Sequence, residues 1–546
     1  MEPIHGSAEI IFVNGRIYTV DRAFSTASAA AVGNGKILWA GSDDQVKKYR
    51  GSGTRVIDLK GHTVLPGIIE SHMHMQMYGI KLLNVDCFGK TKAEILSDVK
   101  AAYGGIRRGR GEWITGTGWN ETGWEDKRFP TKQELDEIAP DVPVYITRVC
   151  GHLAWVNSTA LTAANIDGST ADPAGGEIHR TASGDATGIL VDTAASLVQK
   201  HIPAVEGTVL EKAYMLAQGD LLKNGITSIH DLAPSSSYDY GTVEFIAEMY
   251  RKGAMKIAIS SYISADNAEK AYSAGPFTGA FGGRFSMRGV KVFTDGSLGA
   301  RSAWMLEDYD DRPGHRGNCR YTDDELHGLM AAARRGGFQL ATHAIGDAAN
   351  RQVVAAYDRI LRELPEPAEH RSRIEHAQII KRDDIERLLA LEIIPSMQFV
   401  HCTSDKEMTE ERIGPGRLGD AYPWRSFIDG GAIVPGGSDA PVELVNPFHG
   451  IYAAVTRKDR LGRPEGGWRP EHKITRIEAI KAFTIWGAYA AFEEGIRGSI
   501  EAGKAANFTV IDKDIINCPE NEIKDISVIA TILNGETAYA PEGAGL

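Results

Sequence analysis

The segment PGIIESHMH, residues 66–74, decides the fold that we expect for this chain. It is an apolar run that begins at a Pro-Gly turn and ends in two histidines, His72 and His74. Because side chains alternate across a strand, residues two positions apart share a face. A His-x-His pair is weak evidence by itself, since it also describes two polar side chains on an ordinary strand. Its place at the end of an apolar strand favours a metal site.

Four more polar residues close short apolar runs: Lys291 in GVKVFTDG, His343 in ATHAIGD, His376 in RIEHAQ and Asp439 in GGSDAPV. Taken singly, each histidine is explained as well by a hydrogen-bonded core residue, and the aspartate by a turn or helix cap. A ligand at the C-terminal end of successive strands is, however, how a (β/α)8 barrel builds a metal centre. Imidazole and carboxylate suit zinc and similar ions, so we expect one or two divalent cations, with zinc first.

Lys291 is unusual within an apolar strand, because burying an ammonium group is costly. One explanation is an ion pair with a nearby acid such as Asp295. The other is that the amine reacts with CO2 to give a carbamate, an anion that can bridge two cations. The residues leave both explanations open.

The middle of the chain alternates strands with helices. Eight apolar segments are expected as barrel strands: 63–72, 225–232, 256–263, 289–295, 338–344, 372–377, 393–399 and 432–439. Helical patterns such as 324–337 and 383–392 lie between them. This alternation predicts an α/β fold with a parallel sheet, and eight units predict closure into a (β/α)8 barrel, the TIM barrel.

The remaining segments predict two further domains. Asn-Gly pairs at 14–15, 34–35 and 534–535 lie between alternating apolar residues, which predicts β-hairpins at both chain ends. We therefore expect a composite β-sandwich from 1–62 and 498–546, and the barrel from 63–85 and 216–497. The long gap after the first barrel strand predicts an insertion lobe, 86–215, over the active site.

Composition excludes several functions. A net charge of −12 and a pI of about 5.8 argue against a nucleic-acid partner. The absence of an 18-residue apolar run argues against a membrane span. Five scattered cysteines without a CxxC pair, and the lack of an evident signal peptide, predict reduced thiols in a cytoplasmic protein.

Long motifs give the chain a family resemblance. They include GRIYTVD, LPGIIESHMH, GWNETGW, GHLAWVNSTAL, DPAGGEIHR, VKVFTDGSLGARSA, RIEHAQ, YPWRSF, GSDAPVE and GSIEAGKAANFTVID. In these motifs the chain resembles the amidohydrolase superfamily over nearly its whole length. The closer match is to the amidohydrolase family 3 branch, which includes N-substituted formamide deformylase-like proteins.

The resemblance implies a role for each candidate ligand. His72 and His74 would hold a more buried metal, His343 and His376 would hold a more exposed one, and a carboxylated Lys291 would bridge this binuclear centre. Asp439 would be a ligand of the first metal and the general base. Two positions depart from the family pattern, Glu70 and Asn507, where aspartate is usual. Neither is an expected ligand. A homodimer, common in the superfamily, is a further expectation.

The implied activity is metal-dependent hydrolysis of a carbon–nitrogen bond in a small amide, other than a peptide. A metal lowers the pKa of bound water to roughly 7, which supplies hydroxide as nucleophile. Asp439 would take a proton during attack and return it to the leaving nitrogen. The alternatives are a cyclic-amide or deaminase-type hydrolase, a non-hydrolytic lyase, or a catalytically silent metal-binding protein.

Aromatic residues are candidates for the substrate pocket. They are Trp119, Trp124 and Trp155 in the insertion, and Phe399 and Trp424 near later strand ends. Ordinary core packing explains each of them equally well. If several line the site, an aromatic or apolar substituent on the amide is favoured. His152 is a candidate polar contact, or else a structural part of the GHLAW turn.

Overall fold

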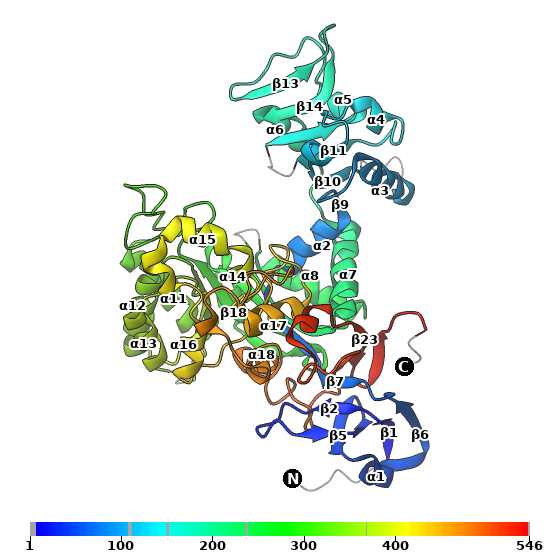
Figure 1. Cartoon of the computed structure of the whole chain (residues 1–546), viewed down its shortest axis with the longest axis vertical. Helices are drawn as coiled ribbons and strands as arrows, with labels where there is room; N and C mark the ends of the chain where they lie inside the picture. The colour runs from blue at the N-terminus through cyan, green and yellow to red at the C-terminus, as the bar shows by residue number, and fades with distance from the viewer. Residues whose placement is uncertain (1–6, 107–111, 149–151, 235–237, 367–368, 544–546) are drawn as a thin grey trace. The chain divides into compact units, whose positions relative to one another are not determined.

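The computed structural model describes residues 7–106, 112–148, 152–234, 238–366 and 369–543 (Figure 1). The chain divides into two compact units, one made of Met1–Met75 with Gln218–Leu546 and the other of Gln76–Ala217. Each unit is described by itself.

The larger unit contains the expected α/β barrel. Among the described residues, seven neighbouring strands pair in parallel: β8 (Ile68–Met73), β15 (Ile226–Leu232), β16 (Ala258–Ser264), β18 (Phe285–Phe293), β19 (Gln339–Ala344), β20 (Arg373–His376) and β21 (Ile394–Ser396). Helices alternate with them, among them α8 (Tyr240–Arg251), α11 (Asp323–Arg335), α12 (Asp347–Glu363) and α13 (Arg382–Ala390). The predicted fold class is therefore confirmed.

The expected eighth strand, 432–439, is not a regular strand. Isolated parallel bridges join Gly436 to Met397, beyond β21, and Ala440 to Met73 in β8. The segment therefore lies between β21 and β8 and nearly closes the barrel. Glycine is required here, because a Cβ atom on Gly437 would lie 2.6 Å from Oε1 of Glu70.

The first predicted strand, 63–72, is divided between two sheets. Its first half, β7 (Thr63–Pro66), pairs with β22 (Phe508–Ile511) and β2 (Arg16–Tyr18), and only β8 enters the barrel. The division falls at Pro66-Gly67, where the Gly67 amide donates to the Asn507 carbonyl at 2.8 Å. Proline has no backbone N–H to donate to a neighbouring strand, so the strand pairing is interrupted there and the chain leaves one sheet for the other.

Both chain ends contribute to one β-structure. One sheet has the order β5 (Lys36–Gly41), β4 (Ala29–Gly33), β1 (Ala8–Val13), β6 (Arg50–Asp58). The other has the order β24 (Glu536–Tyr539), β23 (Val528–Leu533), β22, β7, β2, β3 (Thr26–Ala27). Phe12 and Phe508, from opposite ends of the chain, share its core with ring centroids 5.5 Å apart.

Two of the three expected hairpins form. The pairs Asn34-Gly35 and Asn534-Gly535 both have positive φ and join antiparallel strands, as a tight hairpin turn requires. The expected hairpin at 14–15 is wrong, because β1 and β2 lie in different sheets. Asn14 has φ 55°, whereas Gly15 does not have positive φ, so the pair forms a crossover between sheets.

The smaller unit, 76–217, includes the predicted insertion. Its sheet has the order β13 (Gly176–Arg180), β14 (Ala186–Asp192), β12 (Leu153–Val156), β11 (Val144–Arg148), β10 (Ile114–Trp119), β9 (Val85–Asp86). The 14-residue helix α3 (Lys92–Gly105) contributes Ile95 and Val99 to the core. The placement of this unit over the active site stays a prediction.

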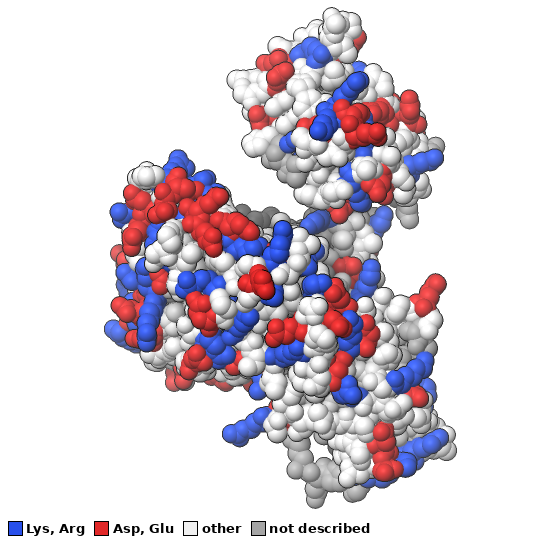
Figure 2. All heavy atoms as spheres, viewed as in Figure 1, with Lys and Arg blue, Asp and Glu red and all other residues white. Residues whose placement is uncertain are grey.

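Charged side chains of both signs are interspersed over the described surface seen in Figure 2. Within the described ranges, no helix has the length and apolarity needed to cross a membrane.

Candidate metal centre

The six predicted ligands come from barrel strands and the segment that closes them. His72, Lys291, His343 and His376 lie in β8, β18, β19 and β20, while His74 follows β8 directly and Asp439 lies in the closing segment. All six side chains are buried. This is the edge of a barrel at which catalytic groups are found.

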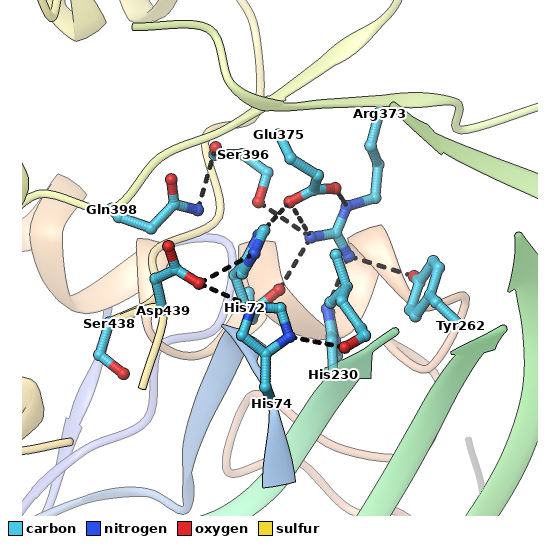
Figure 3. A network of polar contacts seen from close by, with 12 residues as sticks. His72, His74, His230, Tyr262, Arg373, Glu375, Ser396, Gln398, Ser438 and Asp439 are labelled. Atoms are coloured by element: carbon cyan, nitrogen blue, oxygen red, sulfur yellow. Dashed lines mark hydrogen bonds and ion pairs between the residues drawn. The ribbon is translucent and has the colours of Figure 1, made fainter. Parts of the chain in front are cut away.

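Three of these residues form a compact donor group. The candidate ligand atoms of His72, His74 and Asp439 all lie within 4.8 Å of one another. Oδ1 of Asp439 lies 2.9 Å from Nε2 of His74 and 3.4 Å from Nε2 of His72. Figure 3 shows the two imidazoles and the carboxylate converging from separate chain segments.

Hydrogen bonds orient both imidazole rings. Nδ1 of His72 lies 2.6 Å from Oε2 of Glu375, and Nδ1 of His74 lies 2.7 Å from the carbonyl oxygen of Leu232. Since both partners only accept, the assigned tautomer carries its proton on Nδ1. Each Nε2 then offers a lone pair toward Asp439, as metal-binding histidines do.

Glu375 belongs to a buried charge network that the sequence analysis missed (Figure 3). Nη2 of Arg373 donates to Glu375 at 3.0 Å, to the Ser71 carbonyl at 2.8 Å and to Oγ of Ser396 at 2.9 Å. Burial acts to raise the pKa of Glu375, but the charge of Arg373 and the bond from His72 hold it well below its usual range. A signal was available: RIEH places opposite charges two positions apart in a short strand that is buried throughout.

A second donor group shares Asp439. The ligand atoms of His376, His401 and Asp439 also lie within 4.8 Å of one another. His401, the first residue of α14 (His401–Ser404), was not predicted as a site residue. Like His74, it is the first histidine after a barrel strand, and that position was the available signal.

Lys291 is not paired with Asp295. Within the described structure, Nζ of Lys291 makes no hydrogen bond and lies 4.8 Å from the ring centroid of Phe293. Burial lowers the pKa of Lys291 to about 8. Asp295 instead accepts from backbone amides, including those of Ile345 at 3.1 Å and Gly346 at 2.8 Å. The ion pair between Lys291 and Asp295 therefore does not form in the described structure.

His343 lies beside His376, with ring centroids 4.6 Å apart. Its Nε2 lies 3.3 Å from Oδ1 of Asp295 and 3.4 Å from the Gly296 carbonyl oxygen. His343 is thus at the centre, although its donor atoms belong to neither compact group.

The protonation states suit a divalent cation. Burial lowers the pKa of His72 and brings that of His376 well below its ordinary value, so both imidazoles are neutral at pH 7. Burial opposes ionisation of Asp439, but His72 and His74 hold its pKa well below the usual range. Nε2 of His72, Nδ1 of His376 and Oδ1 of Asp439 are buried and make no hydrogen bond within the described chain. Neutral imidazoles and an ionised carboxylate are the ligand forms that a metal requires, so the residues fit the expected cation.

Glu70 fixes the closing segment against β8. Its Oε1 accepts from the amides of His72 at 3.0 Å and Ser438 at 2.9 Å, next to the candidate ligand Asp439. Burial raises the pKa of Glu70 to about 7. The glutamate that departs from the family pattern therefore connects two ligand-bearing segments.

The candidate substrate residues are mostly buried in cores. Trp119, Trp124 and Trp155 belong to the core of the 76–217 unit, where Nε1 of Trp155 donates to the Thr131 carbonyl at 2.8 Å. Phe399 and Trp424 are fully buried and pack edge to face at 5.1 Å. This burial favours structural roles, and contact with substrate stays a prediction.

His152 differs from the aromatic candidates because its side chain is 71% exposed. Its Nδ1 lies 2.7 Å from Oδ1 of Asp192. The role of His152 in substrate binding also stays a prediction.

Comparisons with known proteins show the family and the fold to which this chain is similar. A family model described as "Amidohydrolase family" matches residues 55–539. The chain is 33% identical over 539 residues to YtcJ of Bacillus subtilis (strain 168), an amidohydrolase by name, covering 97% of this chain and 99% of that protein. It is 28% identical over 560 residues to the N-substituted formamide deformylase of Arthrobacter pascens, covering 98% and 99% respectively. A crystal structure of an uncharacterized metal-dependent hydrolase from Pyrococcus furiosus matches with a TM-score of 0.74 and 28% identity, over 93% of this chain and 100% of that one.

Proposed function

The chain belongs to the amidohydrolase family, in its family 3 branch, and we propose that it hydrolyses the carbon–nitrogen bond of a small N-substituted amide with the help of divalent metal. The observation that carries this proposal is the Asp439 carboxylate, which lies between two groups of buried imidazoles. We propose zinc as the metal, because the donors are imidazole and carboxylate.

His72 and His74 would hold one cation together with Asp439, and His343 and His376 would hold a second. Bound divalent cations supply Lewis acidity, which polarises a carbonyl and makes water more acidic. Asp439, ionised at neutral pH, accepts the proton of the attacking water on a carboxylate oxygen and then returns it to the leaving nitrogen. The amide carbon leaves as a carboxylic acid and the nitrogen as an amine.

We also propose that Lys291 carries a carbamate. Burial lowers the pKa of Lys291 to about 8, so at neutral pH more of its amine is unprotonated than for an ordinary lysine. The nitrogen lone pair attacks the carbon of CO2, and the nitrogen releases one proton. The resulting anion would take the place of the buried ammonium group, and its oxygens would be available as ligands for the divalent cations.

The substrate proposal rests on a relative. The deformylase from Arthrobacter pascens acts, by its name, on N-substituted formamides. We therefore propose an N-substituted formamide as the first substrate class, with N-acyl and cyclic amides as the next.

The experiment compares metal-stripped protein with protein reloaded with zinc, manganese or cobalt, on a panel of N-formyl, N-acyl and cyclic amides. Amine release measures activity, and elemental analysis measures metal. We expect activity to disappear on chelation and to return with metal. His72→Asn should stay inactive after reloading, while the exposed-helix control Glu386→Gln should behave as wild type. Full activity in metal-free protein would refute the proposal, and metal-loaded protein inactive on every amide would favour a lyase or a silent scaffold.

A further inference from the structure

A histidine outside the expected ligand set lies in the metal centre. His401 is 9% exposed, and its Nε2 is buried without a hydrogen bond among the described residues. Its ring is nearly parallel to that of His376, with an interplanar angle of 12° and centroids 6.1 Å apart. A buried imidazole nitrogen without a partner is costly, so the position of His401 calls for a ligand.

The distance to Asp439 identifies the kind of ligand. Nε2 of His401 lies 3.9 Å from Oδ2 of Asp439, which is too long for a hydrogen bond. Two donors that each lie about 2.0–2.2 Å from one cation are separated by at most about 4.3 Å. A cation therefore fits between these two atoms.

Asp439 presents a different oxygen to each donor group. Its Oδ1 is the atom near His72 and His74, and its Oδ2 is the atom near His401. One carboxylate thus reaches both histidine groups, and the pair His376 and His401 completes the second group.

The backbone holds His401 in this place. Its amide donates to the Gln398 carbonyl at 3.1 Å, and its carbonyl accepts from the Asp405 amide at 2.8 Å. Both sequence neighbours of His401 are buried, with Cys402 0% exposed and Val400 9% exposed, so the turn that follows β21 is packed on both sides of this residue.

We propose that His401 is a metal ligand, which together with Asp439 adds to His343 and His376 as ligands of the second divalent cation. This proposal rests on the metal centre of the proposed function, but not on its amide substrate. Imidazole and carboxylate donors favour zinc, cobalt or nickel over magnesium or calcium, which prefer oxygen ligands.

The test measures metal binding rather than turnover. Wild type and His401→Ala are stripped of metal and titrated with zinc against a competing chelator, and the equivalents of bound zinc per chain are measured. Cobalt-loaded samples of both proteins are then compared by visible absorption. We expect two equivalents in wild type. In His401→Ala we expect zinc affinity to be unchanged at the first site and weakened by about 100-fold or more at the second. Loss of a ligand should cost more than the roughly 10–100-fold loss that follows removal of an outer hydrogen-bond partner of a ligand. We also expect the cobalt spectrum to change. His327→Ala, a histidine in α11 paired with Glu363, is the matched control.

His401→Gln is the second variant, because it keeps a polar side chain if alanine disturbs the turn. If these variants bind both zinc equivalents with wild-type affinity, the proposal is overturned. A raised KM in such a variant would not rescue it, because unchanged metal binding with a raised KM assigns His401 to substrate contact. A wild type that binds fewer than two equivalents at saturating zinc would also overturn it. A wild type that binds two equivalents but hydrolyses no amide would remove the proposed function and leave this proposal standing.

Discussion

Nδ1 of His72 donates to Oε2 of Glu375 across 2.6 Å, and Glu375 is held in turn by Arg373. All three side chains are fully buried. A carboxylate behind a ligand histidine selects its tautomer and raises the basicity of the nitrogen that faces the metal. The orientation of the first ligand therefore depends on a charge pair within β20.

The first prediction concerns that charge pair. Glu375→Gln keeps the shape of the side chain and a hydrogen-bond acceptor but removes the charge. We expect zinc affinity to fall by about 10–100-fold. We also expect the free energy of unfolding to fall by about 3–5 kcal/mol, because Arg373 is left buried without its counter-charge. Chelator competition and denaturant unfolding measure the two effects.

The control is Glu386→Gln, which removes a glutamate whose side chain is 65% exposed. It should change neither quantity. If Glu375→Gln binds zinc as tightly as wild type, the contact to His72 has no part in positioning the ligand.

The second prediction concerns Lys291. Lys291→Ala should lose activity and much of the second metal, because no bridging anion can form. Short carboxylic acids such as acetate should restore part of the activity by occupying the place of the carbamate. Lys47→Ala, at an exposed position, is the control and should be neither impaired nor rescued. Density for an unmodified amine in an active protein with both metals bound would contradict the carbamate.

The third prediction concerns Asp439. Asp439→Asn keeps a ligand oxygen but cannot accept the proton, so kcat should fall by at least about 10²-fold. We expect the melting temperature to change little, because the Glu70 carboxylate still accepts from the Ser438 amide and the Gly437 amide still donates to the Met397 carbonyl. Steady-state kinetics on metal-saturated protein measures the loss. Asp429→Asn, an exposed residue of α16 (Trp424–Asp429), is the control. A near-normal kcat in Asp439→Asn would remove this residue from the mechanism.

The sequence predicts the ligands that end strands, because alternation and barrel geometry place them together whatever the loops do. His72 and His376 are examples. It does not predict His401, since the turn after β21 decides where that side chain points. Nor does it predict the closing segment around Gly437, where close contact with Glu70 replaces a regular ladder. Arg373 and Glu375 were recognisable as buried charges, but their partner His72 lies 303 positions away from Glu375.

The fourth prediction concerns acid stability. His472 is buried, and desolvation together with the nearby charge of Arg457 lowers its pKa to about 4. The unfolded chain binds this proton with a pKa of about 6.5. The folded state therefore binds fewer protons, so the contribution of His472 is complete above about pH 6.5 and is lost as the pH falls toward 4.

In free energy this loss is about 3 kcal/mol, since one pKa unit corresponds to about 1.4 kcal/mol. In His472→Gln the group that titrates is gone, so wild type should lose more stability than the variant between pH 7 and 4. Denaturant unfolding at several pH values tests this. His201→Gln, at an exposed histidine, should run parallel to wild type. Parallel curves for His472→Gln would show that His472 is not a source of acid lability.

The last prediction concerns the tryptophans of the 76–217 unit. Trp119 and Trp155 are fully buried, and each indole donates to a backbone carbonyl, that of Ile146 at 2.9 Å and that of Thr131 at 2.8 Å. Truncating such a side chain costs about 3–5 kcal/mol. We therefore expect Trp119→Ala and Trp155→Ala to lower the melting temperature by about 10 °C or more. Phe88→Ala, at a side chain that is 51% exposed, should cost much less.

Metal content separates this structural role from a direct one. The candidate ligands lie in the other unit, so we expect both variants to bind as much metal as wild type. A structural role predicts early melting and an unchanged KM across an amide panel for the folded fraction. A changed substrate preference at a normal melting temperature would instead support the aromatic pocket predicted from the sequence. Truncating a core residue always removes packing contacts. A wild-type melting temperature in both variants would therefore also show that the two indoles do not pack in a core.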